Sequence, residues 1–368
     1  MKTIVVSAVN LRKGGTLTIL KDCLGYLSEL ACSGEYRVIA LVHKESLVKI
    51  PHVEYIEMPW CVKSWILRLW CEYITMYRVS RQLSPIYLWL SLHDTTPNVR
   101  AERKAVYCHN PFAFYPWKWK ELLLNYRIVC FAWFTKYIYR INIHRNDYIL
   151  VQQQWIRRRF TEIFGVPEER IIVTRPANGL AKSDYVPKVR EKGLYSFLFP
   201  SFGDIHKNFD LLCEATSLLE KEIGDKQFEV VLTISGTEST YTRMLYDKWG
   251  SVSSLRFVGF LDKDKLEYHY NVADALVFPS KVETWGLPIT EFARYGKPML
   301  LADQPYAYET AAGCNSVAFF STSNACDLAA KMKKLIYNDT SFLGSVPEPL
   351  IKQPTTSSWQ ELFDILLK

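Results

Sequence analysis

Short runs of β-branched and aromatic residues alternate with amphipathic helical patterns along almost the whole chain. Runs of this kind are typical of strands buried on both faces of a sheet, and each is followed by a segment of helix length. The alternation predicts parallel sheets built from βαβ units, in two series. The expected strands are 3–9, 37–42, 86–90, 104–108, 148–152 and 171–175, then 195–200, 229–235, 255–260, 275–278, 299–302 and 317–320.

A polar stretch near 182–193 separates the two series and shows no periodicity, which indicates a domain boundary. We expect an N-terminal domain over 1–182, a linker over 183–193 and a C-terminal domain over 194–355. A last amphipathic segment, 356–368, is expected to pack back on the N-terminal domain. The predicted fold class is α/β, with two Rossmann-like, doubly wound parallel sheets facing a central cleft.

Composition excludes several classes of protein. The hydrophobic fraction of 49% is enough for two cores, and no apolar run approaches the roughly 20 residues of a membrane span. The N-terminus turns polar too early for a signal peptide, so a cytoplasmic location is expected. The nine cysteines are odd in number and widely spaced, which favours neither a disulfide framework nor a metal knuckle.

Charge divides the chain unevenly. Residues 1–190 hold 28 Lys and Arg against 15 Asp and Glu, a net of +13, which leaves −6 for the remainder. A basic half suits nucleic acid, an anionic membrane surface or a phosphate-bearing substrate. No nucleic-acid recognition module is found, so nucleic acid is not an expected partner.

Two aromatic stretches stand out in the basic half. Residues 65–77 carry aromatic and aliphatic side chains at helical spacing, which is typical of a face packed in a core. Residues 112–140 carry aromatics and cations on most faces, and one buried stripe does not explain them. Contact with anionic lipid and a lipid-diphosphate acceptor is expected there, at a tip formed by Trp117, Lys118, Trp119 and Lys120.

The loop after the first strand contains Gly14 and Gly15. Paired glycines let backbone N–H groups approach a ligand phosphate at a helix start, but they also fit an ordinary tight turn. Both interpretations stay open from this loop alone. The loop lacks the GxGxxG pattern, which argues against a dinucleotide dehydrogenase.

The segment 278–298 holds two carboxylates, Glu283 and Glu291, eight positions apart. Glu283 falls in the loop after an expected strand, and Glu291 about one turn into a helix that begins near Gly286-Leu287-Pro288. A loop carboxylate can hold sugar hydroxyls and one in the first turns can bind a ribose diol. The alternative is a surface acid and a charge that complements the helix dipole. The strand, Gly-Leu-Pro and Gly-Lys-Pro context favours the site.

This E-x7-E segment resembles the donor-site signature of the retaining GT-B glycosyltransferases, family 4 in particular. The resemblance extends in order along nearly the whole chain. Its other parts are the Gly14-Gly15 loop, 106–111, 176–179, the turn at 205–208, and 258–261 before 273–275.

The resemblance implies roles for particular residues. His109, Lys207 and Glu283 are the expected catalytic residues: His109 lies against the donor sugar, Lys207 neutralises the diphosphate, and Glu283 binds the transferred sugar. Glu291 would bind the ribose. The full donor-binding set it implies is Gly14, Gly15, Asn178, Lys207, Gly286, Leu287 and Glu291.

The chain departs from the family at two points. Phe202 stands where members commonly carry an arginine, five positions before Lys207, and Leu180-Ala181 stands where an acidic residue is often found. Asp262-Lys263-Asp264 is formally a D-x-D, the metal motif of another glycosyltransferase fold. It lies where helix-capping acids belong, so it is interpreted as a cap. The resemblance implies an enzyme with no metal and no cofactor.

The expected function is transfer of a hexose-type sugar, with retention, from a nucleoside-diphosphate sugar to a lipid-linked glycan. The product would belong to an O-antigen, capsule or exopolysaccharide made at the cytoplasmic face of a membrane, with the enzyme bound peripherally to an anionic surface. No side chain is an evident nucleophile, so a same-face displacement is expected. The alternatives are an epimerase or hydrolase of sugar nucleotides on the same fold, and a catalytically silent scaffold.

Overall fold

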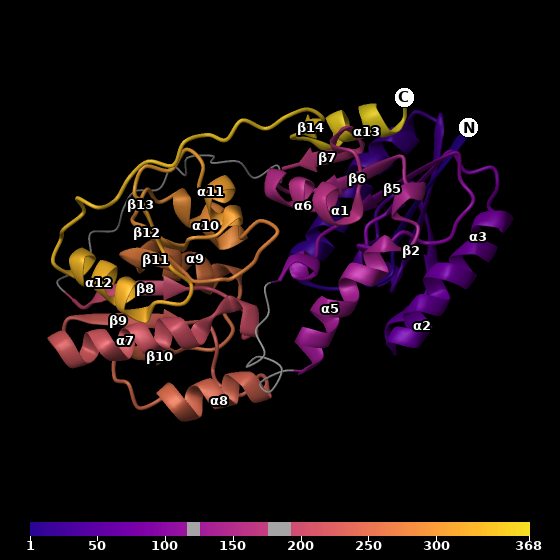
Figure 1. Cartoon of the computed structure of the whole chain (residues 1–368). Coiled ribbons are helices and arrows are strands. Elements are labelled where there is room, and N and C mark those ends of the chain that lie inside the picture. Colours follow the sequence, from indigo (N-terminus) through magenta and orange to yellow (C-terminus); the bar gives the residue numbers. More distant parts are fainter. Residues whose placement is uncertain (116–125, 176–192) are drawn as a thin grey trace. The chain divides into compact units, whose positions relative to one another are not determined.

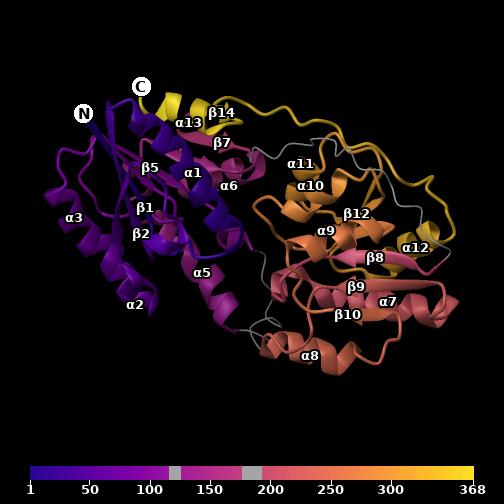
Figure 2. The ribbon, with the colours of Figure 1, turned by 180° about the vertical axis from the view of Figure 1, so that it is seen from behind.

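The computed structural model describes residues 1–115, 126–175 and 193–368, and they form two compact units (Figure 1). The first unit takes in Met1–Ala113, the described residues from Trp133 to Arg175, and Ile351–Lys368. The second takes in the described residues of Phe114–Ala132 and of Asn178–Leu350. Each unit is built on one parallel sheet, seen from behind in Figure 2, and this confirms the predicted fold class.

The sheet of the first unit has eight strands in the order β14-β7-β6-β5-β4-β1-β2-β3, and all of its pairings are parallel. Strand β1 lies in the interior, where the strand order reverses. The strands are β1 (Lys2–Ala8), β2 (Tyr36–Val42), β3 (Val53–Glu57), β4 (Leu88–Ser91), β5 (Arg103–Tyr107), β6 (Tyr148–Val151), β7 (Ile171–Thr174) and β14 (Thr355–Thr356).

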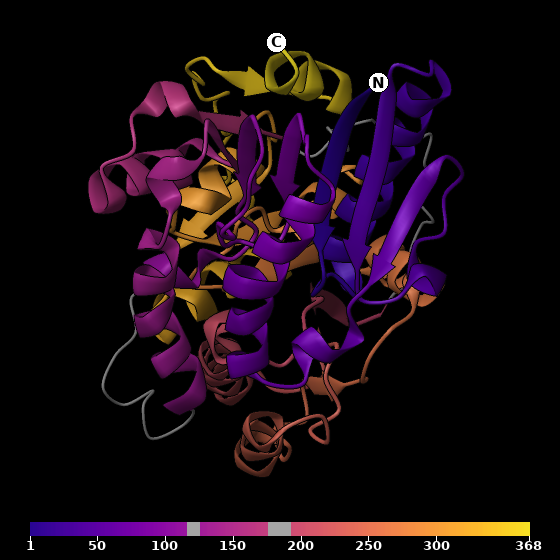
Figure 3. The ribbon, with the colours of Figure 1, turned by 90° about the vertical axis from the view of Figure 1, so that its right-hand side faces the viewer.

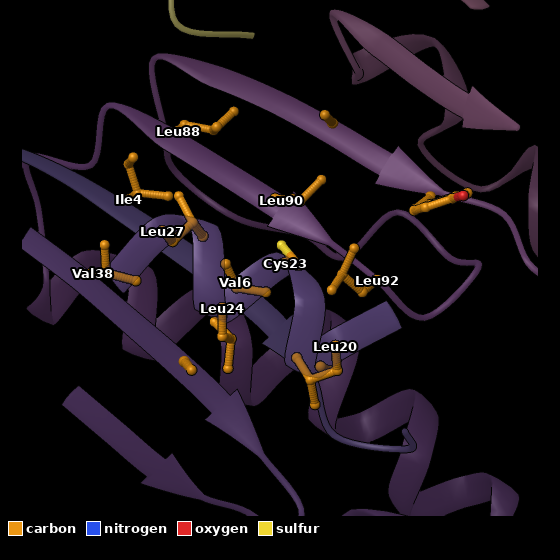
Figure 4. Close-up of a cluster of buried hydrophobic side chains, with 14 of the residues drawn as sticks. Ile4, Val6, Leu20, Cys23, Leu24, Leu27, Val38, Leu88, Leu90 and Leu92 are labelled. Carbon is orange, nitrogen blue, oxygen red and sulfur yellow. The ribbon is translucent and has the colours of Figure 1, made fainter. Parts of the chain in front are cut away.

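Helix α1 (Gly14–Cys32) covers one face of this sheet. Figure 4 shows its inward side chains, Leu20, Cys23, Leu24 and Leu27, against side chains of β1, β2 and β4. All of these are buried, so the hydrophobic effect fixes the helix on the sheet. The other helices of this unit are α2 (Trp65–Trp70), the π-helical turn η3 (Cys71–Thr75), α3 (Met76–Gln82), the part of α5 (Tyr126–Arg140) from Trp133 on, and α6 (Gln154–Phe164).

The C-terminal helix α13 (Trp359–Leu366) belongs to the first unit. Its buried face adds Leu362, Phe363 and Leu366 to the core under α1. The ring of Phe363 stacks on that of Tyr26, with centroids 5.5 Å apart. The last residues of the chain therefore complete the core that the first residues begin.

The sheet of the second unit has six parallel strands in the order β10-β9-β8-β11-β12-β13. The strands are β8 (Tyr195–Phe199), β9 (Phe228–Leu232), β10 (Leu255–Phe257), β11 (Ala275–Phe278), β12 (Met299–Ala302) and β13 (Val317–Phe320). The helices are α7 (Phe209–Ile223), α8 (Thr240–Trp249), α9 (Lys263–Val272), α10 (Leu287–Ala293), α11 (Pro305–Thr310) and α12 (Ala325–Ile336).

Three parts of the first unit differ from expectation, and the first is the two-residue strand β14, which was not predicted. Strand β3 was not predicted, because its sequence VEYIE sits at the sheet edge with two exposed glutamates and lacks the apolar run of a central strand. The prediction of a core face over 65–77 is wrong at its start, since Trp65, Ile66, Leu69 and Trp70 are exposed. Among the described residues, no helix is long and apolar enough to cross a membrane.

Candidate functional site

In the second sheet, the order of the strands along the chain reverses at β8. This strand pairs with β9 on one side and with β11 on the other. In open α/β sheets, ligands bind where the strand order reverses, outside the carboxyl ends of the strands. The loops that leave β8 and β11 at this edge carry Lys207 and Glu283. The topology therefore brings two of the predicted site residues to the position where a ligand is expected.

Lys207 ends a single 3-10 turn, Ile205–Lys207, between β8 and α7. The next residue, Asn208, takes a left-handed backbone (φ 62°) and starts α7, while its side-chain amide donates to the carbonyl of Thr322. This bend stops the lysine from continuing into the helix. Its side chain is only 15% exposed, so the ammonium is held close to the protein surface.

The ammonium of Lys207 donates to the carboxylate of Glu283, with Nζ and Oε1 2.5 Å apart. The backbone N–H of Lys281 also donates to the carbonyl of His206, at 2.8 Å. These two bonds tie the loop after β8 to the loop after β11. The pairing was not predicted, because the two residues are far apart in sequence and were assigned to different parts of a ligand.

Gly286 and Leu287 lie at the start of α10. Gly286 has φ +87°, a backbone that favours glycine, and a Cβ there would lie 3.3 Å from Cδ1 of Ile289. Pro288 occupies the first turn, where a missing N–H costs nothing. The Gly-Leu-Pro sequence thus makes a sharp turn from the Glu283 loop into the helix that carries Glu291.

Glu291 is half-buried on α10 and accepts a hydrogen bond from the hydroxyl of Tyr270 on α9, at 2.7 Å. Tyr270 is itself buried, and burial, followed by the charge of Glu291, raises its pKa well above the usual value. The tyrosine therefore stays a donor at all physiological pH values. Sequence reasoning missed Tyr270, because nothing in the local pattern of α9 connects it to a residue 21 positions later.

Two exposed phenylalanines, Phe202 and Phe260, lie after β8 and β10. Their rings are 6.1 Å apart at the centroids and nearly parallel, with 14° between the planes. They are 65% and 71% exposed, so the stack presents apolar surface to solvent. Phe202 makes this contact at the position where the family commonly places an arginine.

In the first unit, His109 follows β5, and its loop is fixed by Asp94 from the loop after β4. Asp94 Oδ1 accepts from the backbone N–H of His109 at 2.5 Å and of Asn110 at 3.0 Å. The two ring nitrogens of His109 are shielded from solvent, and burial lowers its pKa to about 4. The imidazole is therefore neutral at pH 7.

Asp94 was not among the predicted site residues. It has a left-handed backbone (φ 72°), and burial raises its pKa to about 6 against the lowering effect of the His109 N–H and of Arg68. A partly buried acid in a left-handed turn is held there by its surroundings. The sequence signal available was an Asp at the end of a strand, which is also common in ordinary turns.

The remaining predicted residues fall in two groups. Gly14 (φ +64°) and Gly15 are exposed and form the first turn of α1, where a Cβ on Gly14 would meet no atom within 4 Å. Gly14 is therefore not required there by close packing of neighbouring atoms. Asn178 and the four residues Trp117, Lys118, Trp119 and Lys120 lie outside the described residues.

The D-x-D sequence is a helix cap, as predicted. The side chain of Asp262 accepts from the backbone N–H of Lys265 at 2.9 Å and so caps α9. Within the three described ranges, no group of three or more His, Cys, Asp or Glu residues is arranged to hold a metal ion.

Residues 186–345 match the family model of the glycosyl transferases group 1. The O-antigen chain mannosyltransferase B of Escherichia coli is 25% identical over 166 residues, 42% of this chain and 43% of that protein. The O-antigen chain mannosyltransferase RfbU of Salmonella typhimurium is 24% identical over 221 residues, 59% of this chain and 56% of that protein. The chain thus aligns with about half the length of these curated relatives.

Two solved structures share the fold over nearly the whole chain. A glycosyltransferase from Rickettsia africae has a TM-score of 0.64 at 14% identity, covering 99% of this chain and 97% of that one. HepE of Anabaena, in complex with UDP and glucose, has a TM-score of 0.61 at 14% identity, covering 94% and 93%. The chain therefore has the GT-B fold of these solved structures, and its residues 186–345 match the glycosyl transferases group 1 family model.

Proposed function

We propose that the chain is a retaining hexosyltransferase that takes its sugar from a nucleoside-diphosphate donor. The single observation that carries the proposal is the grouping at the reversal point of the second sheet: Lys207 and Glu283 in contact, with Glu291 on the helix that follows. An ammonium beside a carboxylate suits a diphosphate joined to a sugar. The mannosyltransferase names of the curated relatives make mannose the first candidate for the sugar.

Each residue has a distinct part in the proposed binding. Lys207 Nζ, a point charge with three donors, would neutralise the diphosphate, together with the backbone at Gly286 and Leu287. Glu283 would accept bonds from hydroxyls of the transferred sugar. Glu291 would hold the ribose diol with the oxygen atoms that Tyr270 leaves available.

Transfer is proposed to proceed on one face of the sugar. The bond from the anomeric carbon to the diphosphate oxygen breaks, and the acceptor hydroxyl oxygen bonds to the same carbon. The proton of that hydroxyl passes to an oxygen of the departing diphosphate, so no side-chain nucleophile is needed. Lys207 would stabilise the charge that develops on the leaving group.

His109 of the first unit is proposed to contact the donor sugar as a neutral imidazole, since its pKa is about 4. A neutral ring can donate through one nitrogen and accept through the other, which suits a sugar hydroxyl. Gly14, Gly15 and Asn178 complete the proposed donor set. The reaction is proposed to need no metal, because Lys207 supplies the positive charge.

The acceptor is proposed to be a lipid-linked glycan of O-antigen, capsule or exopolysaccharide type, used at the surface of an anionic membrane. The names of the curated relatives favour the O-antigen class. The net charge of +13 over residues 1–190 suits a polyanionic surface and a diphosphate-bearing acceptor.

The test is a thermal-shift panel of GDP-mannose, UDP-glucose, UDP-galactose, a dTDP-sugar and a CMP-sugar, each with magnesium and with EDTA. A ligand that binds the native state raises the melting temperature by mass action. We expect a shift with one class of donor, equal in both buffers and lost in Glu291→Ala. Asp264→Asn, an exposed carboxylate on α9, is the matched control and should keep the shift.

Three outcomes count against the proposal. A shift that requires magnesium would overturn metal independence. A donor that binds and is converted with no acceptor present would favour an epimerase or hydrolase. No shift with any donor would favour a catalytically silent scaffold. The first explanation for the lost donor binding would then be Phe202, which stands in place of an arginine.

A further inference from the structure

Helix α2 presents its apolar side chains to solvent. Trp65, Ile66, Leu69 and Trp70 are between 36% and 78% exposed. Four large apolar side chains on a helix of six residues leave α2 with almost no core face, and its described neighbours in the chain hold it in place instead. Scattered exposed apolar residues are ordinary, whereas a contiguous group of them marks an interaction surface.

The π-helical turn η3 explains why the prediction of a core face over residues 65–77 failed at its start. Residues 65–82 run as one helical stretch, but the turn Cys71–Thr75 is wider than an α-helical turn and shifts the phase of the residues on either side. The buried positions are Cys71 and Glu72 within the turn and Met76 and Ser80 in α3 after it. The apolar residues before it therefore lie off the buried face.

Helix α5 carries a second group of exposed apolar side chains: Trp133, Phe134, Tyr137 and Ile141, the last just beyond the helix end, are 42% to 52% exposed. Its opposite side is anchored, because Tyr139 is buried against Phe160 and donates to the carbonyl of Asn110. Figures 1, 2 and 3 agree that α2 and α5 extend from the same side of this unit.

The charge around both helices has one sign. Within residues 59–82 the single acidic residue is Glu72, which is buried and paired with Arg68, and residues 126–146 contain none. The cations of these segments that reach solvent include Lys63, Arg78, Arg81, Arg140 and Arg145. Tryptophan and tyrosine among lysines and arginines, with no exposed carboxylate, match the interface of an anionic bilayer.

We propose that α2 and the exposed face of α5 form a membrane-contact surface for anionic phospholipid. Trp65, Ile66 and Trp70 enter the headgroup region, and the surrounding cations face lipid phosphates. This deepens the proposed function, since it assigns the contact with the acceptor's membrane to residues outside the Trp117–Lys120 tip. Binding to lipid needs no donor, so the membrane-contact proposal can be tested independently of the transferase proposal.

The experiment is sedimentation of the full chain with vesicles of phosphatidylglycerol and phosphatidylethanolamine, and with vesicles of phosphatidylcholine. We expect binding to the anionic vesicles alone, weakened by salt. The triple variant Trp65→Ser, Ile66→Ser and Trp70→Ser should lower the partition coefficient at least tenfold. Lys136→Glu with Arg140→Glu should lower it at least fivefold for each charge replaced, in line with the attraction of one basic residue to such a surface.

The matched control is Tyr268→Ser, Tyr337→Ser and Leu350→Ser, three exposed side chains of the second unit, and it should bind vesicles as the wild type does. All variants should keep the far-UV circular dichroism spectrum and the melting temperature of the wild type without donor, which shows that they are folded. Equal partitioning of the α2 triple variant and the wild type would overturn the proposal. So would a wild-type dimer that the triple variant converts to a monomer while vesicle binding is unchanged, since α2 would then be a contact between copies.

Discussion

Lys207 Nζ and Glu283 Oε1 are 2.5 Å apart although 76 residues separate them in the chain, and both side chains are less than one-sixth exposed. Each was predicted to touch a different part of a donor. In the free protein each satisfies the charge of the other. A bound diphospho-sugar would have to share or replace this ion pair, so the pair is both a structural contact and part of the proposed site.

We predict that Lys207→Met lowers kcat by at least a hundredfold, because the charge that forms on the leaving diphosphate loses its counter-ion. The same change leaves Glu283 shielded and unpaired, which should cost about 1–3 kcal/mol of folding free energy. Steady-state kinetics measure the first effect and urea unfolding the second.

A double-mutant cycle separates the two roles. Lys207→Met and Glu283→Gln should couple by about 1–3 kcal/mol in stability, because the residues share one shielded contact. The exposed pair Lys248 and Asp210, 2.9 Å apart, is the control and should couple by less than about 1 kcal/mol. Equal coupling energies in the two cycles would show that the Lys207–Glu283 contact contributes no more to stability than an exposed ion pair.

Tyr270→Phe should raise the donor KM about three- to tenfold and leave kcat nearly unchanged. The hydroxyl holds Glu291, and without it the carboxylate loses one fixed donor before it meets the ribose. Loss of the hydrogen bond from the Tyr270 hydroxyl should also lower the free energy of unfolding by about 1 kcal/mol. Initial rates against donor concentration give the split between KM and kcat.

Tyr295→Phe is the control for this change, because Tyr295 also donates to a carboxylate, that of the neighbouring Glu267, at an exposed position. Its donor KM should stay at the wild-type value. If Tyr270→Phe lowered kcat and left KM alone, Tyr270 would not act through ribose binding.

Phe202→Arg should tighten donor binding about three- to tenfold. The arginine would stand where the family commonly has one and add a guanidinium near Lys207, which matches a diphosphate in charge and shape. The side chain is 65% exposed, so the fold should tolerate it. Phe202→Leu removes the stack on Phe260 without adding charge, and calorimetric titration of both variants with donor distinguishes the two effects. Weaker binding by the arginine variant would assign the phenylalanine stack itself to the ligand.

Much of the architecture was predictable, because every central strand is an apolar run flanked by helix-length segments, and such runs pair only with one another. The C-terminal helix was predictable from its amphipathic pattern. The edge strand Val53–Glu57 was not, since its exposed glutamates hide the period. The start of the 65–77 stripe was misjudged because no sequence rule reports a π-helical turn.

At the site, the predictable residues were those within one motif or next to a strand end. Glu283, Gly286 and Glu291 share a single segment, and Lys207 follows a clear strand. The partners that hold them were not predictable, because Tyr270 and Asp94 reach their targets through tertiary contacts between different βα units. The local sequence pattern therefore predicts the motif residues, whereas the residues that hold them in place depend on tertiary packing.

The pKa of Asp94 predicts a pH-dependent stability. Burial raises it to about 6 from an unfolded value near 4, so the native state binds more protons between these values. Stability from this group is thus present at low pH and is lost as pH rises through 6. Asp94→Asn removes that penalty while keeping an oxygen for the two backbone N–H groups. The melting temperature of the variant minus that of the wild type should increase from pH 4.5 to pH 7.5.

His109→Gln should show the opposite slope. Burial lowers the His109 pKa to about 4, so the unfolded state binds more protons between about 4 and 6.5 and the wild type loses stability as pH falls. The variant lacks this loss, so its melting temperature minus that of the wild type should increase toward pH 4.5. Slopes of the same sign in the two variants would contradict one of the two assignments, and the sign would show which one.

Phe363→Ala should destabilise the first unit by about 3–5 kcal/mol, the usual cost of truncating a buried phenylalanine. The ring is buried in the core under α1 and stacks on Tyr26, so its removal opens a cavity that the sheet and α1 cannot close. Hydrogen exchange should report the loss in β1, β2 and α1 and leave the amides of β8 to β13 protected as before. Leu350→Ala, at a side chain that is 89% exposed, should change neither set. If α13 were only a loosely attached tail, the Phe363 variant would exchange as the wild type does, and the assignment of Ile351–Lys368 to the first unit would fail.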